Sequence, residues 1–329
     1  MFDVITIGTA TRDIFLKSKS FKAFKDIHFE SGKSIAFELG TKTEVEELFY
    51  ETGGGATNAA VSLARLGLKT AACFEVGKDL AGKDIVRTIK KNKISSNLIR
   101  IDSKNHTSVS IIFLTPEGER NIFVHRGSLI DEKEINLKKL KSKWLYVSSV
   151  GGNIKLLNKI ARFVEKKDIN LALNPGSKEL KLGLKKLSRV FNATDVLILN
   201  RNEASSLMGI SYNFKKTIFR KACGLTPGIE VITDGRAGAY ATDDERGYRV
   251  GIYDWEITDR LGAGDAFGSG FVGAYIKYNQ NIEKALQYAS FNASSVVTKI
   301  GAKAGIVNHF PAKPLRVKVE NMLCKTKSS

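Results

Sequence analysis

The sequence predicts an α/β fold in which helices flank both faces of a central, mostly parallel sheet and a small β-sheet forms a lid. The first observation is that short apolar runs alternate with helix-compatible stretches, which is typical of a parallel sheet. The second is that two segments, about 13–52 and 108–126, break this alternation. The third is the length of 329 residues, with 43% hydrophobic and 26% charged residues, which suits a globular chain. We therefore expect a single domain over residues 1–329.

The alternating elements follow one another in chain order. Ala59–Leu66 carries small apolar residues and Lys83–Asn92 is amphipathic, so we expect both segments to be helices. The apolar runs between helical stretches have the length of buried strands. The expected strands are Val4–Gly8, Lys69–Val76, Trp144–Ser148, Leu171–Leu173, Val196–Leu199 and Glu230–Thr233.

The lid is expected from the two segments that break the alternation. Between Asp13 and Thr52 the chain has short alternating segments with few helix patterns. Ser108–Val124 has the pattern of a hairpin around the turn Thr115-Pro-Glu-Gly118. A small sheet of this kind has an exposed edge, and pairing of two edges would cover them, so we expect a homodimer.

The charge and the cysteines limit the classes of protein to which the chain could belong. Lysine and arginine number 52 against 34 acidic residues, a formal charge of +18, which requires a nucleic-acid binder to be considered. The lysines are spread along the chain without a nucleic-acid-binding motif, so we expect a solvated basic surface and no nucleic-acid partner. No apolar run is long enough to span a bilayer, and the start lacks the pattern of a signal peptide. Three scattered cysteines fit a reducing compartment, and we expect a cytoplasmic protein.

The most informative segment is Gly262-Ala-Gly-Asp265, which precedes a run of small and apolar residues. Consecutive small residues before a helix let successive backbone N–H groups point at one place, where the positive end of the helix dipole adds to them. Such a turn can bind the negative charge that develops in phosphoryl transfer. Asp265 stands where it could accept the proton of an attacking hydroxyl. On these residues alone, Asp265 could also be a simple helix cap.

A second glycine-rich segment, Gly53–Asn58, also stands before a helix. Its glycines allow a ligand to approach the backbone, and Asn58 offers both a donor and an acceptor. With Glu75 about 20 residues further on, the segment partly imitates a dinucleotide-binding fingerprint, although Asn58 replaces the third glycine. An NAD-dependent oxidoreductase is therefore an alternative, as is a basic nucleic-acid-binding protein.

The two segments together resemble the signature regions of the PfkB (ribokinase-like) carbohydrate kinases. Their order, their separation and the chain length agree with that family. The resemblance implies an ATP- and Mg²⁺-dependent kinase that phosphorylates a hydroxymethyl group of a sugar, or of a nucleoside. It implies Asp265 as the general base and an anion hole made by Gly262, Ala263 and Gly264. It also implies that Asp13 binds substrate hydroxyls, with the help of Gly53, Gly54 and Asn58.

The resemblance also assigns a nucleotide side. Asn200 and Glu203 match an Asn-x-x-Glu motif that organises Mg²⁺ and phosphates, and one carboxylate acting partly through water suits magnesium. The nucleotide loop corresponds to Thr233, Gly235 and Gly238. The adenine pocket corresponds to Asn292 and the neighbourhood of Gly301.

The departures from the family pattern concern the acceptor and a cation. Asp259 is followed by Arg260 where relatives often have threonine, and the resemblance implies that Asp259 could help to hold a monovalent cation such as K⁺. A ribose-specific relative would have an asparagine near Thr11 and a lysine near Gly55, and this sequence has neither. Arg120, at the end of the hairpin, is a candidate for binding an anionic group of the substrate or is a surface residue.

Overall fold

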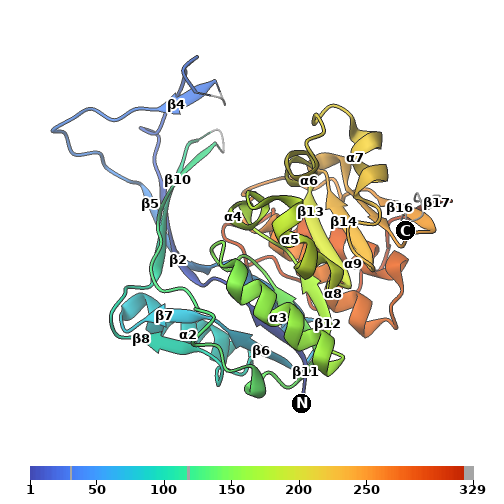
Figure 1. Ribbon diagram of the computed structural model, residues 1–329. Helices are drawn as coiled ribbons and strands as arrows, with labels where there is room; N and C mark the ends of the chain where they lie inside the picture. The colour runs from blue at the N-terminus through green and yellow to red at the C-terminus, as the bar shows by residue number, and fades with distance from the viewer. Residues whose placement is uncertain (30–31, 117–118, 322–329) are drawn as a thin grey trace.

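The computed structural model describes residues 1–29, 32–116 and 119–321, and the largest element in this part of the chain is a nine-stranded sheet (Figure 1). Its strands from β6 to β14 are paired in parallel, and the last three are antiparallel. The order is β17 (Lys318–Asn321), β16 (Arg246–Val250), β15 (Ala239–Thr242), β14 (Ile229–Thr233), β13 (Val196–Asn200), β12 (Asn170–Leu173), β11 (Ser142–Val147), β1 (Phe2–Ile7) and β6 (Thr70–Cys73). The predicted mostly parallel sheet is confirmed.

Helices cover both faces of this sheet, because alternate strand residues point to opposite sides. Leu145 and Val147 belong to one apolar cluster, and Trp144 and Tyr146 belong to another. The first cluster includes α3 (Ile154–Lys167), α4 (Ser177–Leu180), α5 (Gly183–Asn192), α6 (Arg201–Met208) and α7 (Lys215–Ala222). The second includes α1 (Gly55–Arg65), α8 (Ala263–Lys277) and α9 (Ile282–Val296). The predicted α/β layering is therefore present.

One predicted strand, Lys69–Val76, is divided in the structure. β6 ends at Cys73, and β7 (Glu75–Gly77) pairs with β8 (Arg100–Asp102) in a separate sheet. The pairing of β6 with β1 ends at Cys73, and the buried Glu75 of β7 instead pairs with Arg100 of β8 at 3.1 Å. Helix α2 (Leu80–Lys91) follows β7 and buries Ile85 and Ile89.

A second sheet leaves the main body at one edge (Figure 1). Its order is β10 (Arg120–His125), β9 (Ser108–Leu114), β2 (Thr11–Lys17) and β5 (Glu47–Gly53). We call these four strands the small sheet. They correspond to the two segments predicted as a lid, although residues 117–118 of the predicted hairpin turn lie outside the described part. An arm between β2 and β5 carries β3 (Ala23–Lys25) and β4 (Lys33–Ile35).

The helices of the described residues are short relative to a bilayer. None of them is long and apolar enough to cross a membrane.

Candidate active site

The two glycine-rich turns meet at the carboxyl ends of the parallel strands. Gly54 (φ 93°) precedes α1 and Gly262 (φ 78°) precedes α8, and both have backbone conformations that favour glycine. Space is also restricted, since a Cβ on Gly54 would lie 2.5 Å from the Thr9 carbonyl oxygen. The turns join where Asn58 Nδ2 donates to Asp265 Oδ2 at 2.7 Å. Residues 207 positions apart in the chain therefore share one site.

Both helices begin earlier than the sequence pattern suggests. The predicted start of the second helix is near Asp265, but α8 begins at Ala263, so Asp265 lies in its first turn. The predicted first helix starts at Ala59, but α1 begins at Gly55. In each case the positive-φ glycine ends the turn and the following small residues continue directly into the helix. The early start brings Asn58 and Asp265 onto the first turns, with their helix N-termini beside them.

Asp265 lies at the junction of two pockets. It lines a cavity of about 240 Å³ on the nucleotide side and one of about 160 Å³ below the small sheet. Removal from water raises the pKa of Asp265 above its ordinary value. The Asn58 hydrogen bond and the positive charge of Lys303 act in the opposite direction. An acid with a raised pKa beside a helix N-terminus can serve as a general base.

The smaller cavity, which we call the acceptor pocket, contains Asp13. This carboxylate is 5% exposed, and it accepts a hydrogen bond from Thr11 Oγ1 at 3.0 Å. Burial raises the pKa of Asp13. Gly53 leaves room for this carboxylate, since a Cβ at position 53 would lie 2.0 Å from Asp13 Oδ2. The residues lining the acceptor pocket are Thr11, Asp13, Gly54, Asn58, Ser110, Ile112, Ile122, Leu261, Gly262 and Asp265.

Two charged residues near this pocket, the buried Lys303 and the half-buried Glu51, were missed by the sequence analysis. Lys303 is 5% exposed, and its ammonium donates to Asn58 Oδ1 at 2.5 Å and to the Thr52 carbonyl oxygen. Glu51 lies close enough for its charge to interact with Lys303, and burial raises the pKa of Glu51. Lys303 stands in the segment Gly301–Gly305, where it is the charged residue among glycine and alanine. That contrast was the available signal, but it does not identify a partner.

The cavity of about 240 Å³ lies between the acceptor pocket and the nucleotide side, and we call it the intermediate cavity. Five polar residues at the ends of parallel strands, or just after them, border it. Because parallel strands end at the same edge of a sheet, these side chains and backbones gather there. They are Thr9 after β1, Ser148 after β11, Asn174 after β12, Asn200 at the end of β13 and Thr233 at the end of β14. Gly264 and Asp265 form part of the opposite wall. The predicted Asn200, Thr233 and Gly264 thus lie together.

Glu203 lies in this intermediate cavity and caps α6. Its Oε2 accepts from the Asn200 N–H at 2.8 Å, and Asn200 Oδ1 accepts from the Glu203 N–H at 2.8 Å. Burial raises the pKa of Glu203, and the Asp265 charge adds to the increase. Among the described residues, no group of three or more His, Cys, Asp or Glu side chains could hold a metal ion. The side chains that this cavity offers to an ion include the Glu203 carboxylate and the Asn200 amide.

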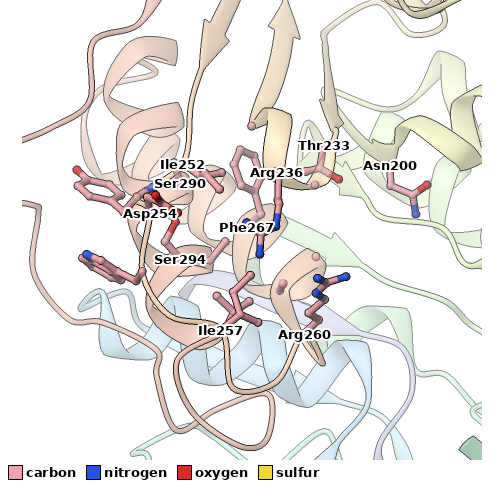
Figure 2. A pocket seen from close by; sticks show the side chains of 18 residues that line it. Asn200, Thr233, Arg236, Ile252, Asp254, Ile257, Arg260, Phe267, Ser290 and Ser294 are labelled. Atoms are coloured by element: carbon pink, nitrogen blue, oxygen red, sulfur yellow. Dashed lines mark hydrogen bonds between the residues drawn. The ribbon is translucent and has the colours of Figure 1, made fainter. Parts of the chain in front are cut away.

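A cavity of about 380 Å³ opens beside the segments predicted to bind the nucleotide, and we call it the nucleotide pocket (Figure 2). Apart from the charged side chains of Arg236, Asp254 and Arg260, apolar and aromatic residues form most of its wall, together with serines of α9. They are Ile252, Tyr253, Trp255, Ile257, Phe267, Ser290, Ala293, Ser294 and Val297. The predicted Thr233, Gly235, Gly238, Ala263 and Gly264 line the same cavity. The sequence analysis missed the segment 252–257, because its residues lie in a loop without a regular pattern.

Gly238 shows why the nucleotide loop needs glycine. Its φ is 85°, and a Cβ there would lie 2.0 Å from the Val250 carbonyl oxygen. Gly235 begins a short 3₁₀ turn, Gly235–Ala237, with φ 54°. The turn follows β14 after Asp234, and Gly235 and Gly238 both line the nucleotide pocket.

Asn292 does not line the nucleotide pocket, contrary to the sequence prediction. It is fully buried, and its Nδ2 donates to Ser62 Oγ at 3.1 Å and to the Ala266 carbonyl oxygen at 2.8 Å. Its Oδ1 accepts from the Val307 N–H at 3.1 Å. Asn292 therefore joins α1, α8 and α9. The inner face of α9 carries Asn292, while the adjacent Ala293 and Ser294 reach the pocket.

Gly301, Asp259 and Arg120 are also placed differently from the predictions. Asp259 is buried, and its carboxylate accepts from the Gly301 N–H at 3.1 Å and from the Leu261 N–H at 2.9 Å. Arg120 approaches Asp259 Oδ1 at 3.5 Å. Gly301 thus binds the loop of Asp259 and is not among the residues that line the nucleotide pocket. Arg120 is the positively charged neighbour of Asp259 and does not line the acceptor pocket, while the monovalent cation stays a prediction.

Glu75 is the acid of the partial dinucleotide fingerprint, and its contacts do not fit the oxidoreductase alternative. It pairs with Arg100 in the β7–β8 sheet, and Asn58 of the fingerprint binds Asp265. The geometry therefore groups the glycine turn with the second signature segment and not with a dinucleotide-binding acid.

Comparison with known proteins agrees with this grouping. The family model described as pfkB family carbohydrate kinase matches residues 3–308. The chain therefore belongs to the pfkB family of carbohydrate kinases, which are ATP-dependent enzymes. The resemblance predicted from the two signature segments is confirmed, and the oxidoreductase alternative is wrong.

The relatives are distant and cover most of the chain. Ribokinase from Bacillus subtilis is 25% identical over 328 residues, which are 98% of this chain and 100% of that protein. An uncharacterized sugar kinase from Archaeoglobus fulgidus is 25% identical over 252 residues, covering 75% of this chain and 98% of that protein. These relatives support a ribokinase-like sugar kinase.

Solved structures show the same fold at low sequence identity. Ribokinase from Arabidopsis thaliana complexed with ribose and ATP superposes with a TM-score of 0.76 at 18% identity, covering 93% of this chain and 96% of that chain. Nucleoside kinase from Burkholderia thailandensis in complex with inosine gives a TM-score of 0.75 at 16% identity, covering 93% of this chain and 95% of that chain. The fold class is therefore that of the ribokinase-like kinases.

Proposed function

We propose that this kinase transfers the γ-phosphate of ATP to a hydroxymethyl group of a neutral sugar bound in the acceptor pocket. The observation that carries this proposal is the position of Asp265. It lies between the acceptor pocket and the cavity that leads to the nucleotide pocket, and it stands in the first turn of α8. A hydroxyl on one side and a phosphate on the other would meet at this carboxylate.

In the proposed reaction, Asp265 accepts the proton of the attacking hydroxyl. The backbone N–H groups of Gly262, Ala263 and Gly264, at the N-terminus of α8, stabilise the negative charge of the transferred phosphoryl group. Positioning supplies much of the acceleration, because phosphoryl transfer requires the attacking and leaving oxygens to be in line. Asp13 binds two hydroxyls of the acceptor, as a carboxylate can accept more than one hydrogen bond.

The charge of the acceptor pocket favours a neutral substrate. Asp13 and Asp265 both line it, and among the described residues no cationic side chain does. A sugar acid or a sugar phosphate would bring a further negative charge next to these carboxylates, and Lys303, the cation that interacts with both, is bound to Thr52 and Asn58 and does not line the pocket. Arg120, the candidate anion contact of the sequence analysis, pairs with Asp259 instead. Sugar hydroxyls can donate to both carboxylates without this cost.

A nucleoside is the second candidate acceptor. The acceptor pocket has an apolar side formed by Ile112, Ile122 and Leu261, which suits the flat face of a base. The nucleoside kinase with bound inosine shares this fold. A nucleoside is also neutral, so both candidates agree with the charge of the pocket.

ATP is the phosphate donor in this proposal, with its base in the nucleotide pocket beside Trp255 and its phosphates near Thr233, Gly235 and Gly238. Asn200 and Glu203 would hold Mg²⁺ against the phosphates, with water completing the coordination. Bound magnesium would neutralise phosphate charge. A monovalent cation such as K⁺ near Asp259 stays a prediction, and it would have Arg120 as a positively charged neighbour.

The small sheet would act as a lid in this reaction. It contributes Asp13, Ser110, Ile112 and Ile122 to the acceptor pocket, and it packs on the loop before α8 through Leu261. Closure would exclude water, which could otherwise accept the phosphoryl group. The edge strand β10 is exposed along its length, so a homodimer through this edge is part of the proposal, as is a cytoplasmic location.

The experiment is a panel of acceptors with purified protein, ATP and Mg²⁺. The panel contains neutral sugars, nucleosides, sugar acids and sugar phosphates, and ADP formation is measured with product analysis. Turnover with a neutral sugar and little with the acids is expected. Turnover with an acidic acceptor alone would contradict the argument from charge, and no turnover with any acceptor would contradict the proposed reaction. Light scattering during chromatography would determine the oligomeric state.

A further inference from the structure

Lys303 is a buried cation at the site for which the proposed reaction has no role. It comes from the segment after α9, is 5% exposed, and is not among the residues that line the acceptor pocket. Burying a lysine costs free energy unless its ammonium is paired and hydrogen-bonded. Its donors go to the Thr52 carbonyl oxygen and to Asn58 Oδ1, the latter at 2.5 Å. The Lys303 ammonium therefore binds the turn before α1 and the side chain of Asn58.

The contact with Lys303 decides which way the Asn58 amide points. An ammonium group can only donate hydrogen bonds, so the oxygen of the amide must face it. The amide nitrogen is then directed to Asp265 Oδ2, at 2.7 Å. A flipped amide would place two donors against each other at Lys303 and two acceptors against each other at Asp265. The two hydrogen bonds therefore run in one direction, from the Lys303 ammonium through the Asn58 amide to the Asp265 carboxylate.

Charged groups from several elements face Lys303. The carboxylates are Asp13 on β2, Glu51 on β5 and Asp265 on α8, and they favour the charged ammonium. Burial and Arg65 on α1 act against it, and the net result lowers the pKa of Lys303 to about 8.

Asp265 is surrounded in turn by groups of both signs. Lys303 and the Asn58 amide stabilise its charged form, while Asp13 opposes it. Its charge also interacts with Tyr146 on β11 and with Glu203 on α6. Lys303 is the cation among these neighbours, so its loss leaves the carboxylates without their compensating charge.

We propose that Lys303 is a positioning residue for phosphoryl transfer: it holds the Asn58 amide in the orientation that binds Asp265 Oδ2, and it supplies the positive charge that faces this carboxylate. Oδ1 of Asp265 is then the oxygen that takes the acceptor proton. This inference rests on the proposed function of Asp265 as the base. Lys303 itself touches neither the acceptor nor the nucleotide in this arrangement.

The inference makes two statements about the pH dependence of kcat. Removing the Lys303 charge raises the pKa of Asp265, so the acidic limb of the profile moves to higher pH. In the unchanged protein, kcat falls as pH rises through about 8, where Lys303 loses its proton. A variant without the lysine lacks this alkaline limb.

The variants are Lys303→Met, which removes charge and donor, and Lys303→Gln, which keeps an N–H donor for Asn58 Oδ1. Lys277→Met is the matched control, because Lys277 donates to the Leu66 carbonyl oxygen at 2.8 Å, away from the acceptor pocket. The assay measures kcat, both KM values and the pH profile with the acceptor identified for the unchanged protein. Thermal unfolding verifies that each variant is folded.

We expect Lys303→Met to lower kcat on the order of tenfold to 100-fold, part of the contribution of a general base, with the KM for ATP within about twofold. Lys303→Gln should keep more of kcat than Lys303→Met and show the same change of pH profile. In a double-mutant cycle, Asn58→Ala should remove most of the effect of Lys303→Met, because the lysine acts through the amide. Lys277→Met should keep the profile of the unchanged protein.

An unchanged protein without kinase activity would contradict the proposed function. If the unchanged protein is active and the Lys303→Met variant keeps its kcat and both the acidic and the alkaline limb of the pH profile, only the role of Lys303 is contradicted. Additive effects of Lys303→Met and Asn58→Ala would contradict action through the amide. If Lys303→Met does not fold, Lys303→Gln decides the inference, since retention of the alkaline limb in that variant would overturn it.

Discussion

The pockets on the two sides of Asp265 are lined by different kinds of side chain. The acceptor pocket of about 160 Å³ contains the carboxylates Asp13 and Asp265, and the buried Lys303 behind it interacts with the charges of both. The nucleotide pocket of about 380 Å³ is lined mainly by apolar and aromatic side chains and by glycine backbone. Directional hydrogen bonds therefore dominate one side, while shape and apolar contact dominate the other.

This difference indicates how each substrate is recognised. Buried charges discriminate strongly between hydroxyl patterns, because an unsatisfied charged group is costly. A mostly apolar pocket gives affinity through buried area and stacking, with a few polar contacts for orientation. Substitutions on one side should therefore change the KM of one substrate, and a substitution at the junction should change kcat. Three experiments test this separation and a fourth tests a buried carboxyl outside both pockets, taken from the largest expected effect to the smallest.

At the junction, Asp265→Asn preserves shape and removes the base. We expect kcat to fall by about 10²–10⁴-fold, the usual contribution of a general base. The affinity for ATP should stay nearly intact, because the nucleotide pocket is separate. Steady-state kinetics and calorimetric binding of ATP provide the measurement. Near-normal turnover would remove Asp265 from its proposed role.

On the acceptor side, Asp13→Ala removes a buried hydrogen-bond acceptor. Bonds to a charged group contribute about 1.5–3 kcal/mol, so the KM for the acceptor should rise by roughly tenfold to 100-fold. The KM for ATP should change little. Equal changes in both KM values would show that the two sides are not independent.

On the nucleotide side, Trp255→Ala removes an aromatic ring from the wall of the pocket. Stacking of a base on an aromatic side chain is worth about 1–3 kcal/mol, so we expect the KM for ATP to rise about tenfold. The KM for the acceptor should remain within about twofold. Phe214→Ala, at an exposed phenylalanine before α7, is the control that should change neither. A rise only in the acceptor KM would assign the ring to the wrong substrate.

The smallest effect concerns stability alone, at a buried carboxyl outside both pockets. Glu230 is 2% exposed, and burial raises its pKa to about 8, above its unfolded value. The folded protein therefore binds more protons than the unfolded chain between about pH 4.5 and 8, and stability falls as pH rises through this window.

Glu230→Gln removes that titration. We expect a gain on the order of 1–3 kcal/mol in unfolding free energy near pH 9, with little change near pH 5. Chemical denaturation at several pH values measures it. Glu165→Gln, at an exposed ion pair with Arg189, is the control and should have a small effect throughout. The kinase kinetics of Glu230→Gln should match those of the unchanged protein, and a change in either KM would connect this strand to the site.

The sequence predicted the parallel sheet, the small sheet and the two glycine turns. These features depend on local pattern: alternating apolar runs define strands, and glycine before a helix defines a turn. Asp13, Asn58 and Asp265 were found for the same reason, since each stands in or beside such a segment. The structure brings these three together at one pocket.

Other residues could not be placed from local pattern. Asn292 matched a position expected at the adenine pocket, but the rotation of α9 directs it inward to Ser62 and Ala266. Arg120 and Asp259 were predicted to bind different ligands, and they bind each other across 139 positions of sequence. Lys303, Glu51 and Trp255 carry no motif at all.

The order of residues along the chain was sufficient to determine which layers form and where a phosphate could approach a backbone. Those outcomes follow from periodicity and from the freedom of glycine, which act over a few neighbouring residues. The identity of each buried charge's partner was decided only by tertiary packing. Lys303 meets Asn58 across 245 positions, and such pairs depend on the distance between folded segments, which no local pattern records.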